Sequence, residues 1–195
     1  MPTDANSQHG LEIFAALSEE TRKKLAAVRL LILDVDGVLT DGGLYYDTEG
    51  KVSKRFNVHD GLGIGLAMRN DLRIAVITGQ DSPAVAARVH VLGIEDYFPG
   101  FIDKRESYKK LREKYSLAKE EVAFLGDDWV DLPVLHAVGV PLAVANAQPE
   151  VLATALYVTK AHGGHGAVRE AIRLIFHCKG QLETLYAAWM EKYRP

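Results

Sequence analysis

The chain has 195 residues, of which 48% are hydrophobic and 25% are charged, and its formal net charge at pH 7 is −3. The length predicts a single domain, residues 1–195, and the weak negative charge excludes the basic surface that nucleic-acid binding requires. No apolar run reaches the length of a membrane-spanning helix, no export signal is visible at the N-terminus, and the one cysteine, Cys178, has no partner for a disulfide. We therefore expect a soluble, cytoplasmic protein whose partners are neither nucleic acids nor membranes.

The first regular elements lead to a pair of carboxylates. Apolar residues recur at helical intervals over 11–28, which predicts a covering helix, in one piece or divided near Ser18. The run Leu30–Leu33 predicts a strand that is buried on both faces and delivers Asp34 to its carboxyl end, with Asp36 two residues later. Two carboxylates at this spacing repel each other unless a proton or a cation accompanies them. The pair therefore indicates acid–base chemistry or a hard metal ion bound through oxygen.

Two other interpretations of this stretch need no active site. The acids can belong to an exposed turn, because Asp and Gly favour turns and Gly37 allows a sharp change of direction. A calcium loop of the EF-hand type fails on spacing, because Gly37 directly follows the second acid, Val38 stands where a third ligand belongs, and the twelfth position is not Glu. What favours a site over a turn is the recurrence of similar ends on later strands.

Residues 43–57 form two short alternating runs around Glu49 and Gly50, which predicts a β-hairpin. The hairpin contains Tyr45 and Tyr46 and is too short to have a core of its own. Because such a hairpin gains stability by docking on another surface, we expect it to contribute a subunit contact.

Helices and strands alternate over the rest of the chain. Asp60 is expected to cap a helix that runs to about Asn70, and Ser82 with Pro83 suits the start of another helix, which Gly93 closes. This alternation predicts an α/β fold with a doubly wound, Rossmann-like parallel sheet whose strands all end along one edge. The predicted helices are about 60–70, 83–91, 105–115, 132–138, 149–156 and 167–177, the predicted strands are 73–78, 97–98, 122–125, 141–145 and 157–159, and a tail covers about 180–195.

Four polar residues follow the predicted strands, namely Asp34, Thr78, Lys104 and Asp127. We expect them to converge at the carboxyl edge of the sheet, where a divalent ion and fixed donors can stabilise the charge of a phosphoryl group. Asp34 is the candidate nucleophile, which would form an aspartyl-phosphate, and Asp36 is the candidate general acid and base. Thr78 and Lys104 would bind the phosphoryl oxygens.

Each of these residues also has a plainer interpretation. Thr78 and Gly79 are typical of a turn, Lys104 of a solvated charge at a helix start, and the acids after Gly126 of a helix N-cap and first turn. Taken singly, the plainer interpretation is the better one. Their joint occurrence at successive strand ends favours catalysis.

The same segments resemble the four motifs of the haloacid dehalogenase-like phosphatases. This resemblance implies a Mg²⁺ ion held by Asp34, the backbone carbonyl of Asp36, and Asp127, with Asp128 or Asp131 helping through water. The motifs are Asp34-Val-Asp36-Gly-Val-Leu-Thr40, Thr78-Gly79, Lys104 and Gly126-Asp127-Asp128-Trp-Val-Asp131.

A narrower resemblance, which spans about residues 10–185, is to the members of that family that hydrolyse the phosphate ester of an eight-carbon sugar acid in lipopolysaccharide precursor synthesis. Relatives usually carry Arg in place of His59 and Gln80, and a basic residue or Glu in place of His165. Fewer charged donors would weaken recognition of the sugar's carboxylate. The segments that carry the resemblance are 38–42, 56–61, 81–83, 126–128 and 163–170, and the implied substrate-binding residues are Thr78, Gly79, Lys104, Arg88, His59 and His165.

Three alternatives stay open. His162 and His165 are spaced for a metal site, but no third ligand is placed nearby, so we favour a loop that faces the substrate. The ester of a nine-carbon sugar acid is an alternative substrate on the same motifs. A non-enzymatic phospho-receiver domain uses similar residues, but its acceptor Asp follows a later strand, whereas here that strand ends in Thr78.

Too few residues separate Asp34 from Thr78, and Thr78 from Lys104, to hold a cap domain, so we expect a capless fold with the hairpin as its small insertion. An uncovered sheet edge would leave the phosphoryl site wet. The tail has apolar residues at helical spacing. The resemblance implies a homotetramer, in which the tail can reach a neighbour's site. The alternative is a tail helix packed on its own subunit. The tail residues concerned are Leu182, Leu185, Tyr186 and Trp189.

Overall fold

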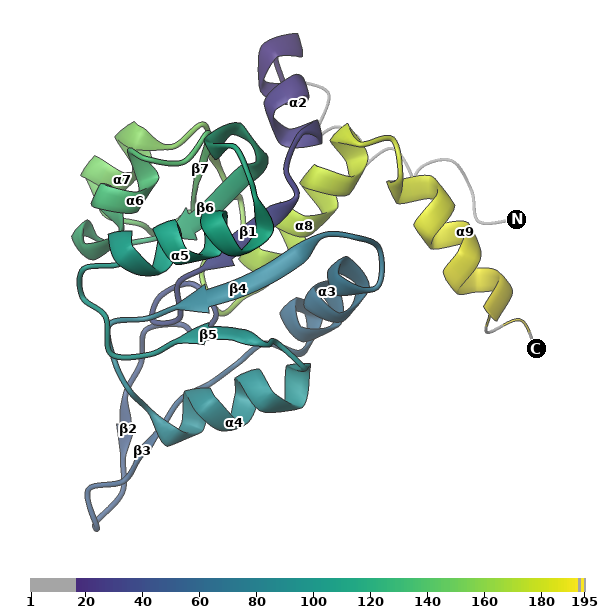
Figure 1. Ribbon diagram of the computed structural model, residues 1–195. Helices are drawn as coiled ribbons and strands as arrows, with labels where there is room; N and C mark the ends of the chain where they lie inside the picture. The colour runs from purple at the N-terminus through teal and green to yellow at the C-terminus, as the bar shows by residue number, and fades with distance from the viewer. Residues whose placement is uncertain (1–16, 193, 195) are drawn as a thin grey trace.

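A computed structural model describes residues 17–192 and 194 of the chain. Its main feature is a six-stranded sheet in the order β5-β4-β1-β6-β7-β8, in which every neighbouring pair is parallel (Figure 1). The predicted doubly wound α/β sheet is therefore confirmed. Its strands are β1 (Leu30–Leu33), β4 (Arg73–Ile77), β5 (Asp96–Phe98), β6 (Val122–Gly126), β7 (Val140–Ala143) and β8 (Tyr157–Val158).

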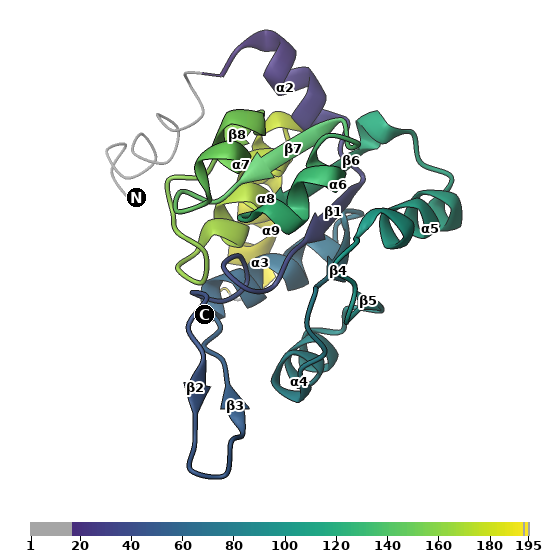
Figure 2. The same ribbon diagram turned by 90° about the vertical axis from the view of Figure 1, so that its left-hand side faces the viewer.

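Helices cover both faces of the sheet (Figures 1 and 2). One layer contains α3 (Val58–Met68), α4 (Pro83–Leu92) and α8 (Ala167–Cys178), and the opposite layer contains α5 (Arg105–Tyr115), α6 (Leu132–Leu135) and α7 (Pro149–Thr154). Two further helices, α2 (Glu19–Ala26) and α9 (Leu182–Lys192), contact α8. Short 3-10 turns, η1 (Lys119–Glu121) and η2 (Trp129–Asp131), flank β6. None of the helices in the described part of the chain combines the length and apolar character that crossing a bilayer requires.

The central strand β1 brings the polar strand ends together. All four of its residues are fully buried, because parallel strands between two helical layers have no solvent face. Leu33 pairs with Val76 of β4 on one side and with Leu125 of β6 on the other. The chain runs outward from β1 to β5 and then crosses by α5 to β6, so the sheet changes direction between β1 and β6. Ligands bind at such a switch point, outside the carboxyl ends of the strands.

The structure defines where two of the predicted helices begin. Part of the predicted 11–28 helix lies outside the described residues, and α2 begins after Ser18, where the sequence allowed a division; the Ser18 hydroxyl accepts a hydrogen bond from the Thr21 N–H at 3.1 Å. The cap of α3 is Asn57, not Asp60, and its amide oxygen accepts from the His59 N–H at 2.8 Å. Asp60 already lies in the first turn of α3, from where its carboxylate reaches the N-terminus of α8 and accepts from the Arg169 N–H at 2.7 Å.

The helix predicted over 132–138 ends earlier, at Leu135. The chain turns here toward η1, and the Gly139 N–H donates to the Lys119 carbonyl at 2.8 Å. A Cβ atom on Gly139 would lie 2.5 Å from the Glu120 Cα, so only glycine allows this close approach. The contact between backbones therefore ends α6.

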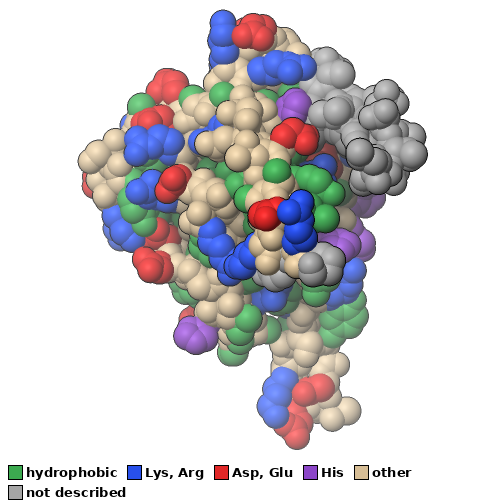
Figure 3. Space-filling view, turned by 90° about the vertical axis from the view of Figure 1, so that its right-hand side faces the viewer, with side chains coloured by type: hydrophobic (Ala, Val, Ile, Leu, Met, Phe, Trp, Pro, Cys, Tyr) green, Lys and Arg blue, Asp and Glu red, His purple; other side chains and the backbone are tan. Residues whose placement is uncertain are grey.

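The predicted hairpin is present as β2 (Tyr45–Tyr46) and β3 (Val52–Ser53), which pair antiparallel and project from the body of the molecule (Figures 2 and 3). Its turn is held by Asp47, whose carboxylate accepts from the N–H groups of Glu49 and Lys51 at 2.9 and 2.8 Å. The tyrosine side chains are exposed. The hairpin therefore presents aromatic surface beside a charged tip.

Candidate active site

The centre of the candidate site is a buried lysine between two aspartates. Lys104, the residue that precedes α5, is fully buried, and its Nζ donates to Asp34 Oδ1 at 2.5 Å and to Asp131 Oδ1 at 2.6 Å. Burial alone would lower the pKa of Lys104, but the charges and hydrogen bonds of the two carboxylates outweigh it and raise the pKa. Lys104 is therefore a charged donor, not the solvated surface lysine of the plainer interpretation.

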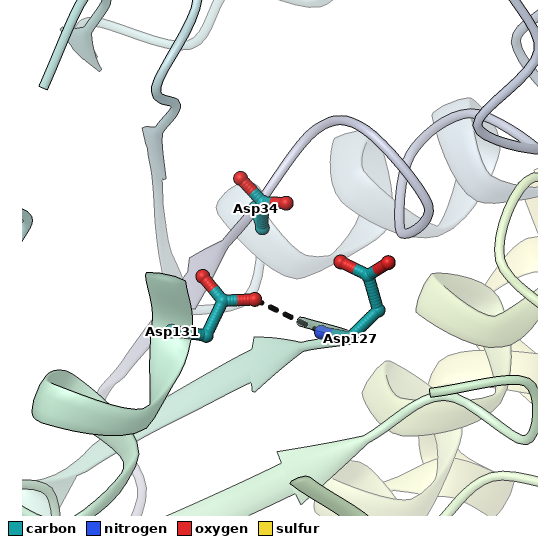
Figure 4. Close-up of side chains that lie close together, drawn as sticks. All are labelled: Asp34, Asp127 and Asp131. Atoms are coloured by element: carbon teal, nitrogen blue, oxygen red, sulfur yellow. Dashed lines mark hydrogen bonds between the residues drawn. The ribbon is translucent and has the colours of Figure 1, made fainter. Parts of the chain in front are cut away.

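Asp131 organises the loop that follows β6 (Figure 4). Its side chain is fully buried, Oδ1 accepts from Lys104, and Oδ2 accepts from the Asp127 N–H at 2.9 Å and the Asp128 N–H at 3.4 Å. Gly126 leaves the necessary room, because a Cβ atom there would lie 2.5 Å from Asp131 Oδ2. With both oxygens occupied, Asp131 positions Lys104 and Asp127.

Asp127 faces Asp34 across the switch point (Figure 4). Its Oδ1 is buried and finds no partner among the described residues. Burial, followed by the charges of Asp34 and Asp131, raises the pKa of Asp127 to about 8, and burial with the charge of Asp131 raises the pKa of Asp34 to about 7. The cluster needs positive charge beyond that of Lys104.

These carboxylates fit a hard cation. Asp34, Asp127 and Asp131 each offer one oxygen, and these oxygens lie within 4.8 Å of one another. An all-oxygen donor set suits Mg²⁺, and the unpartnered Asp127 Oδ1 is the atom that a cation would satisfy. Asp128 is exposed and instead caps η2, since its Oδ1 accepts from the Trp129 N–H at 2.6 Å.

Asp36 lies at the rim of the cluster and has a partner that the sequence analysis missed. Lys54 Nζ lies 2.6 and 2.8 Å from the two Asp36 oxygens, and the Lys54 side chain is only 1% exposed. The alternation of the hairpin could have identified it, because Lys54 falls on the same side as the partly buried Val52 and Phe56. Lys54 therefore belongs to the candidate site.

Thr78 and Gly79 follow β4 at the same edge of the sheet. Thr78 is buried, its N–H donates to the Phe98 carbonyl at 3.0 Å, and its hydroxyl oxygen accepts from the Gln80 N–H at 3.3 Å. The hydroxyl hydrogen can still be donated, because a threonine hydroxyl is both donor and acceptor. The Thr-Gly turn therefore closes β4 and leaves a hydroxyl donor available at this edge of the sheet.

The Gly-rich loop 161–166 packs directly on the loop that follows β1. A Cβ atom on Gly163 would lie 1.6 Å from the Gly37 carbonyl oxygen, and the Gly164 N–H donates to the Val38 carbonyl at 2.9 Å. Gly37 itself has a φ of 86°, and a Cβ atom there would lie 2.0 Å from Asp127 Oδ2. The three loops of the site thus meet through their backbones.

The histidines predicted to face the substrate lie outside the acidic cluster. His165 is exposed, and its Nε2 lies 3.4 Å from an Arg55 nitrogen; His59 is exposed on the first turn of α3. Among the described residues, the group of acids and histidines close enough to hold a metal consists of the three aspartates, so the His162 and His165 metal site is not supported.

Arg88, the other predicted substrate-binding residue, is engaged with the backbone before α3. Its guanidinium donates to the Asn57 carbonyl at 3.3 Å and lies 5.9 Å from the centre of the Phe56 ring. The structure therefore groups Arg88 with the start of α3, apart from the carboxylates.

Comparison with known proteins agrees with this geometry. Residues 86–172 match the model of a haloacid dehalogenase-like hydrolase family. The chain is 42% identical over 170 residues to the 3-deoxy-D-manno-octulosonate 8-phosphate phosphatase KdsC of Escherichia coli strain B, an alignment that covers 87% of this chain and 90% of the relative.

Solved structures show the same likeness. The 3-deoxy-D-manno-octulosonate 8-phosphate phosphatase of Yersinia pestis is 40% identical with a TM-score of 0.85, covering 88% of this chain and 92% of that one. The enzyme of that name from Moraxella catarrhalis, in complex with a magnesium ion, a phosphate ion and a KDO molecule, is 33% identical with a TM-score of 0.85, covering 89% of this chain and 99% of that one.

Proposed function

The chain belongs to the haloacid dehalogenase-like hydrolases and, within them, to the family of the 3-deoxy-D-manno-octulosonate 8-phosphate phosphatases, and from this premise we propose that it hydrolyses 3-deoxy-D-manno-octulosonate 8-phosphate to the free sugar acid and phosphate. The observation that carries the proposal is the buried cluster at the switch point. There Lys104 joins Asp34 to Asp131, and Asp127 presents an oxygen that has no donor among the described residues. This arrangement suits an anionic phosphoryl group and a cation together.

Asp34 is the nucleophile of the proposed mechanism. Its carboxylate attacks phosphorus, the P–O bond to the sugar breaks, and Asp36 gives a proton to the departing alkoxide. The aspartyl-phosphate on Asp34 is then attacked by water, whose proton returns to Asp36, and phosphate leaves with Asp34 restored. Asp36 is therefore the acid of the first step and the base of the second, and Asp34 is first the nucleophile and then the leaving group.

Lys104 and Thr78 bind the transferred group. Two of the three Nζ hydrogens of Lys104 are donated to Asp34 and Asp131, which leaves one for a phosphoryl oxygen. The Thr78 hydroxyl supplies a second donor. Both Asp131 oxygens are already engaged, so Asp34, Asp127 and, as the family resemblance implies, the backbone carbonyl of Asp36 would hold Mg²⁺, whose positive charge would lower the repulsion between carboxylate and phosphate.

We extend the proposal to assembly and compartment. The family resemblance implies a homotetramer, and the exposed Tyr45 and Tyr46 of the hairpin and the exposed Tyr186 of α9 offer surface for subunit contacts. A substrate that is a small sugar phosphate supports a cytoplasmic enzyme of lipopolysaccharide precursor synthesis.

The deciding experiment is a phosphate-release screen with and without Mg²⁺. The substrates are the eight-carbon acid phosphate, its nine-carbon counterpart and neutral hexose phosphates. We expect the highest kcat/KM for the eight-carbon ester. A higher value for the nine-carbon acid would move the assignment to that substrate, and a higher value for a hexose phosphate would refute recognition of a sugar acid.

A further inference from the structure

Lys54 is buried beneath an otherwise exposed hairpin. It follows β3 directly, and its side chain is 1% exposed, whereas the neighbouring Lys51 at the tip is 74% exposed. A buried ammonium group is costly unless each of its hydrogens finds an acceptor. The burial of Lys54 therefore requires specific acceptors for its ammonium group.

All three hydrogens of Lys54 have acceptors. Nζ lies 2.6 and 2.8 Å from the two oxygens of Asp36 and 3.0 Å from Gln80 Oε1. Lysine has three N–H donors, so none is left for a phosphoryl oxygen. Lys104 differs in this respect, because its contacts to Asp34 and Asp131 leave one hydrogen free. Lys54 thus acts on Asp36 and not on the phosphate.

The hairpin does not need Lys54 as its anchor. An isolated β-bridge joins Phe56 to Thr40 of the loop that follows β1. The side chains of Arg55 and Asn57 donate to the Gly164 carbonyl at 3.0 and 3.3 Å. Because these contacts already tie the base of the hairpin to the loop after β1 and to the Gly-rich loop 161–166, an attachment role leaves the burial of Lys54 unexplained.

We propose that Lys54 is a positioning residue for Asp36. The inference rests on the proposed function, in which Asp36 gives a proton to the leaving oxygen. Asp36 is attached next to Gly37, where the backbone has a φ of 86°, and its side chain is 30% exposed. One Nζ that contacts both oxygens fixes the direction of the Asp36 carboxyl group, and it can keep one of these contacts while the other oxygen carries the proton. Gln80 fixes the lysine in turn. The hairpin is therefore part of the catalytic apparatus.

The test compares two leaving groups. A sugar alkoxide needs a proton in order to leave, whereas the 4-nitrophenolate of 4-nitrophenyl phosphate leaves without one. We measure kcat/KM, which reports on events up to loss of the leaving group. With Lys54→Met, kcat/KM for the sugar phosphate should fall about tenfold or more beyond any fall for 4-nitrophenyl phosphate, since general acid catalysis contributes about 10²- to 10⁴-fold. Lys51→Met, on the same hairpin, should change neither value.

Equal losses on both substrates, or no loss on either, would overturn the positioning role. Because Lys54→Met strands a charge on Asp36, the pair is also tested together. The variant Asp36→Asn/Lys54→Met should match Asp36→Asn alone within about threefold, because residues that act as one unit are not additive. A large further loss in the double variant would also contradict the proposal.

The outcomes separate this inference from the proposed substrate. An enzyme that accepts another alkyl phosphate but not the eight-carbon ester would refute only the substrate. The ratio between alkyl and aryl esters can then be measured with the alkyl phosphate that is accepted.

Discussion

At the scale of single residues, the site is a set of carboxylates whose charge is only partly compensated. Asp34 and Asp127 have raised pKa values because burial and neighbouring carboxylates disfavour their charge. Lys104 compensates one of these charges and Lys54 compensates Asp36. A divalent cation would balance the remaining negative charge, and the first predictions test this need for positive charge.

Asp34→Asn should abolish phosphate release, because an amide is neither an adequate nucleophile nor a charged metal ligand. A chelator in excess should have the same effect on the wild-type enzyme, and added Mg²⁺ should reverse it. A continuous phosphate assay measures both. The matched control is Asp71→Asn, which lies before β4 at the opposite edge of the sheet, where Asn tolerates the φ of 60°. Turnover by Asp34→Asn would exclude the aspartyl-phosphate.

The stability of the metal-free protein should fall as the pH rises. The pKa values of Asp34 and Asp127 increase from 3.8 to about 7 and about 8 in the folded state, so the folded protein holds protons that the unfolded chain releases. Their contribution is fully present below about pH 4 and is lost as the pH passes through about 7 to 8. Bound Mg²⁺ replaces these protons and should raise the Tm more at pH 8 than at pH 5.

Thermal melts in chelator and in Mg²⁺ across pH 4 to 9 provide the measurement. Asp127→Asn, which removes one titrating group, should flatten the curve in chelator. Superimposable pH profiles with and without Mg²⁺ would show that the ion does not bind to these carboxylates.

Asp131 and Asp128 offer a direct comparison of a buried and an exposed acid in one loop. Asp131→Asn removes a buried charge from Lys104 and should lower the free energy of unfolding by about 3 kcal/mol, with a loss of kcat, since breaking a buried ion pair is strongly destabilising. Asp128→Asn should change the free energy of unfolding by less than about 0.5 kcal/mol, because Asp128 is exposed and Asn caps a helix equally well. Denaturant titrations compare the two variants, and equal stability would contradict the scaffold role of Asp131.

The site residues that could be predicted from the sequence and those that could not differ in how their positions are set. Asp34, Thr78 and Asp127 follow buried strands, so their place at the edge of the sheet could be predicted from apolar patterning alone. Lys54 contacts Asp36 because the hairpin folds back onto the loop after β1. Whether Asp131 or Asp128 is the buried partner of Lys104 depends on which of the two side chains points inward. Such contacts are set by tertiary packing, which local patterns do not encode.

At the scale of elements, patterning located each strand of the six-stranded sheet and erred at helix ends. Asp60 illustrates the reason. Asp is a favourable N-cap, but Asn57 lies three residues earlier and takes that role, while the carboxylate of Asp60 serves α8, whose own cap position is Gly166 and lacks a side-chain acceptor. Propensity indicates that a residue can cap a helix, whereas packing decides which helix it caps.

The meeting of loops through glycine backbones gives a prediction at this scale. Gly163→Ala should lower both stability, by about 1–3 kcal/mol or more, and kcat/KM, because its Cβ atom would lie 1.6 Å from the Gly37 carbonyl oxygen and must push apart the two loops that frame Asp34. Gly65→Ala is the matched control, since Gly65 lies within α3 with nothing within 4 Å of its Cβ position. That change should stabilise the protein by about 0.5–1 kcal/mol and leave activity unchanged.

Denaturant titration and steady-state kinetics on the two alanine variants give the measurement. If Gly163→Ala keeps wild-type kcat/KM, the packing of the Gly-rich loop does not position the nucleophile.

At the scale of the whole molecule, the site lies at an open edge of the sheet. Between β1 and β4 the chain holds only the hairpin and α3, and between β4 and Lys104 only α4 and β5. These elements leave no room for a cap domain, and specific sites bury most of their ligand. Cover must therefore come from the hairpin, the tail or a neighbouring subunit.

The tail has two faces that bear on this question. Leu182 and Leu185 are partly buried against the core, so the first turns of α9 pack on their own subunit. Tyr186 and Met190 are 57% and 53% exposed, and this apolar surface is available to a neighbour. The base of the tail is therefore anchored within its own chain, and its outer face is free to contact another copy.

We expect light scattering to show a tetramer. Removal of the chain after Gly180 should raise KM for the eight-carbon ester more than it lowers kcat, because the tail would close the sugar end of the site and not the phosphoryl end. Since the deletion also uncovers the surface under Leu182 and Leu185, Tyr186→Ala serves as the milder variant, and it should raise KM in the same direction with little change in the Tm. For 4-nitrophenyl phosphate, which has no sugar to cover, neither change should matter. A monomer with full specificity, or a deletion that leaves both constants intact, would show that one chain completes its own site.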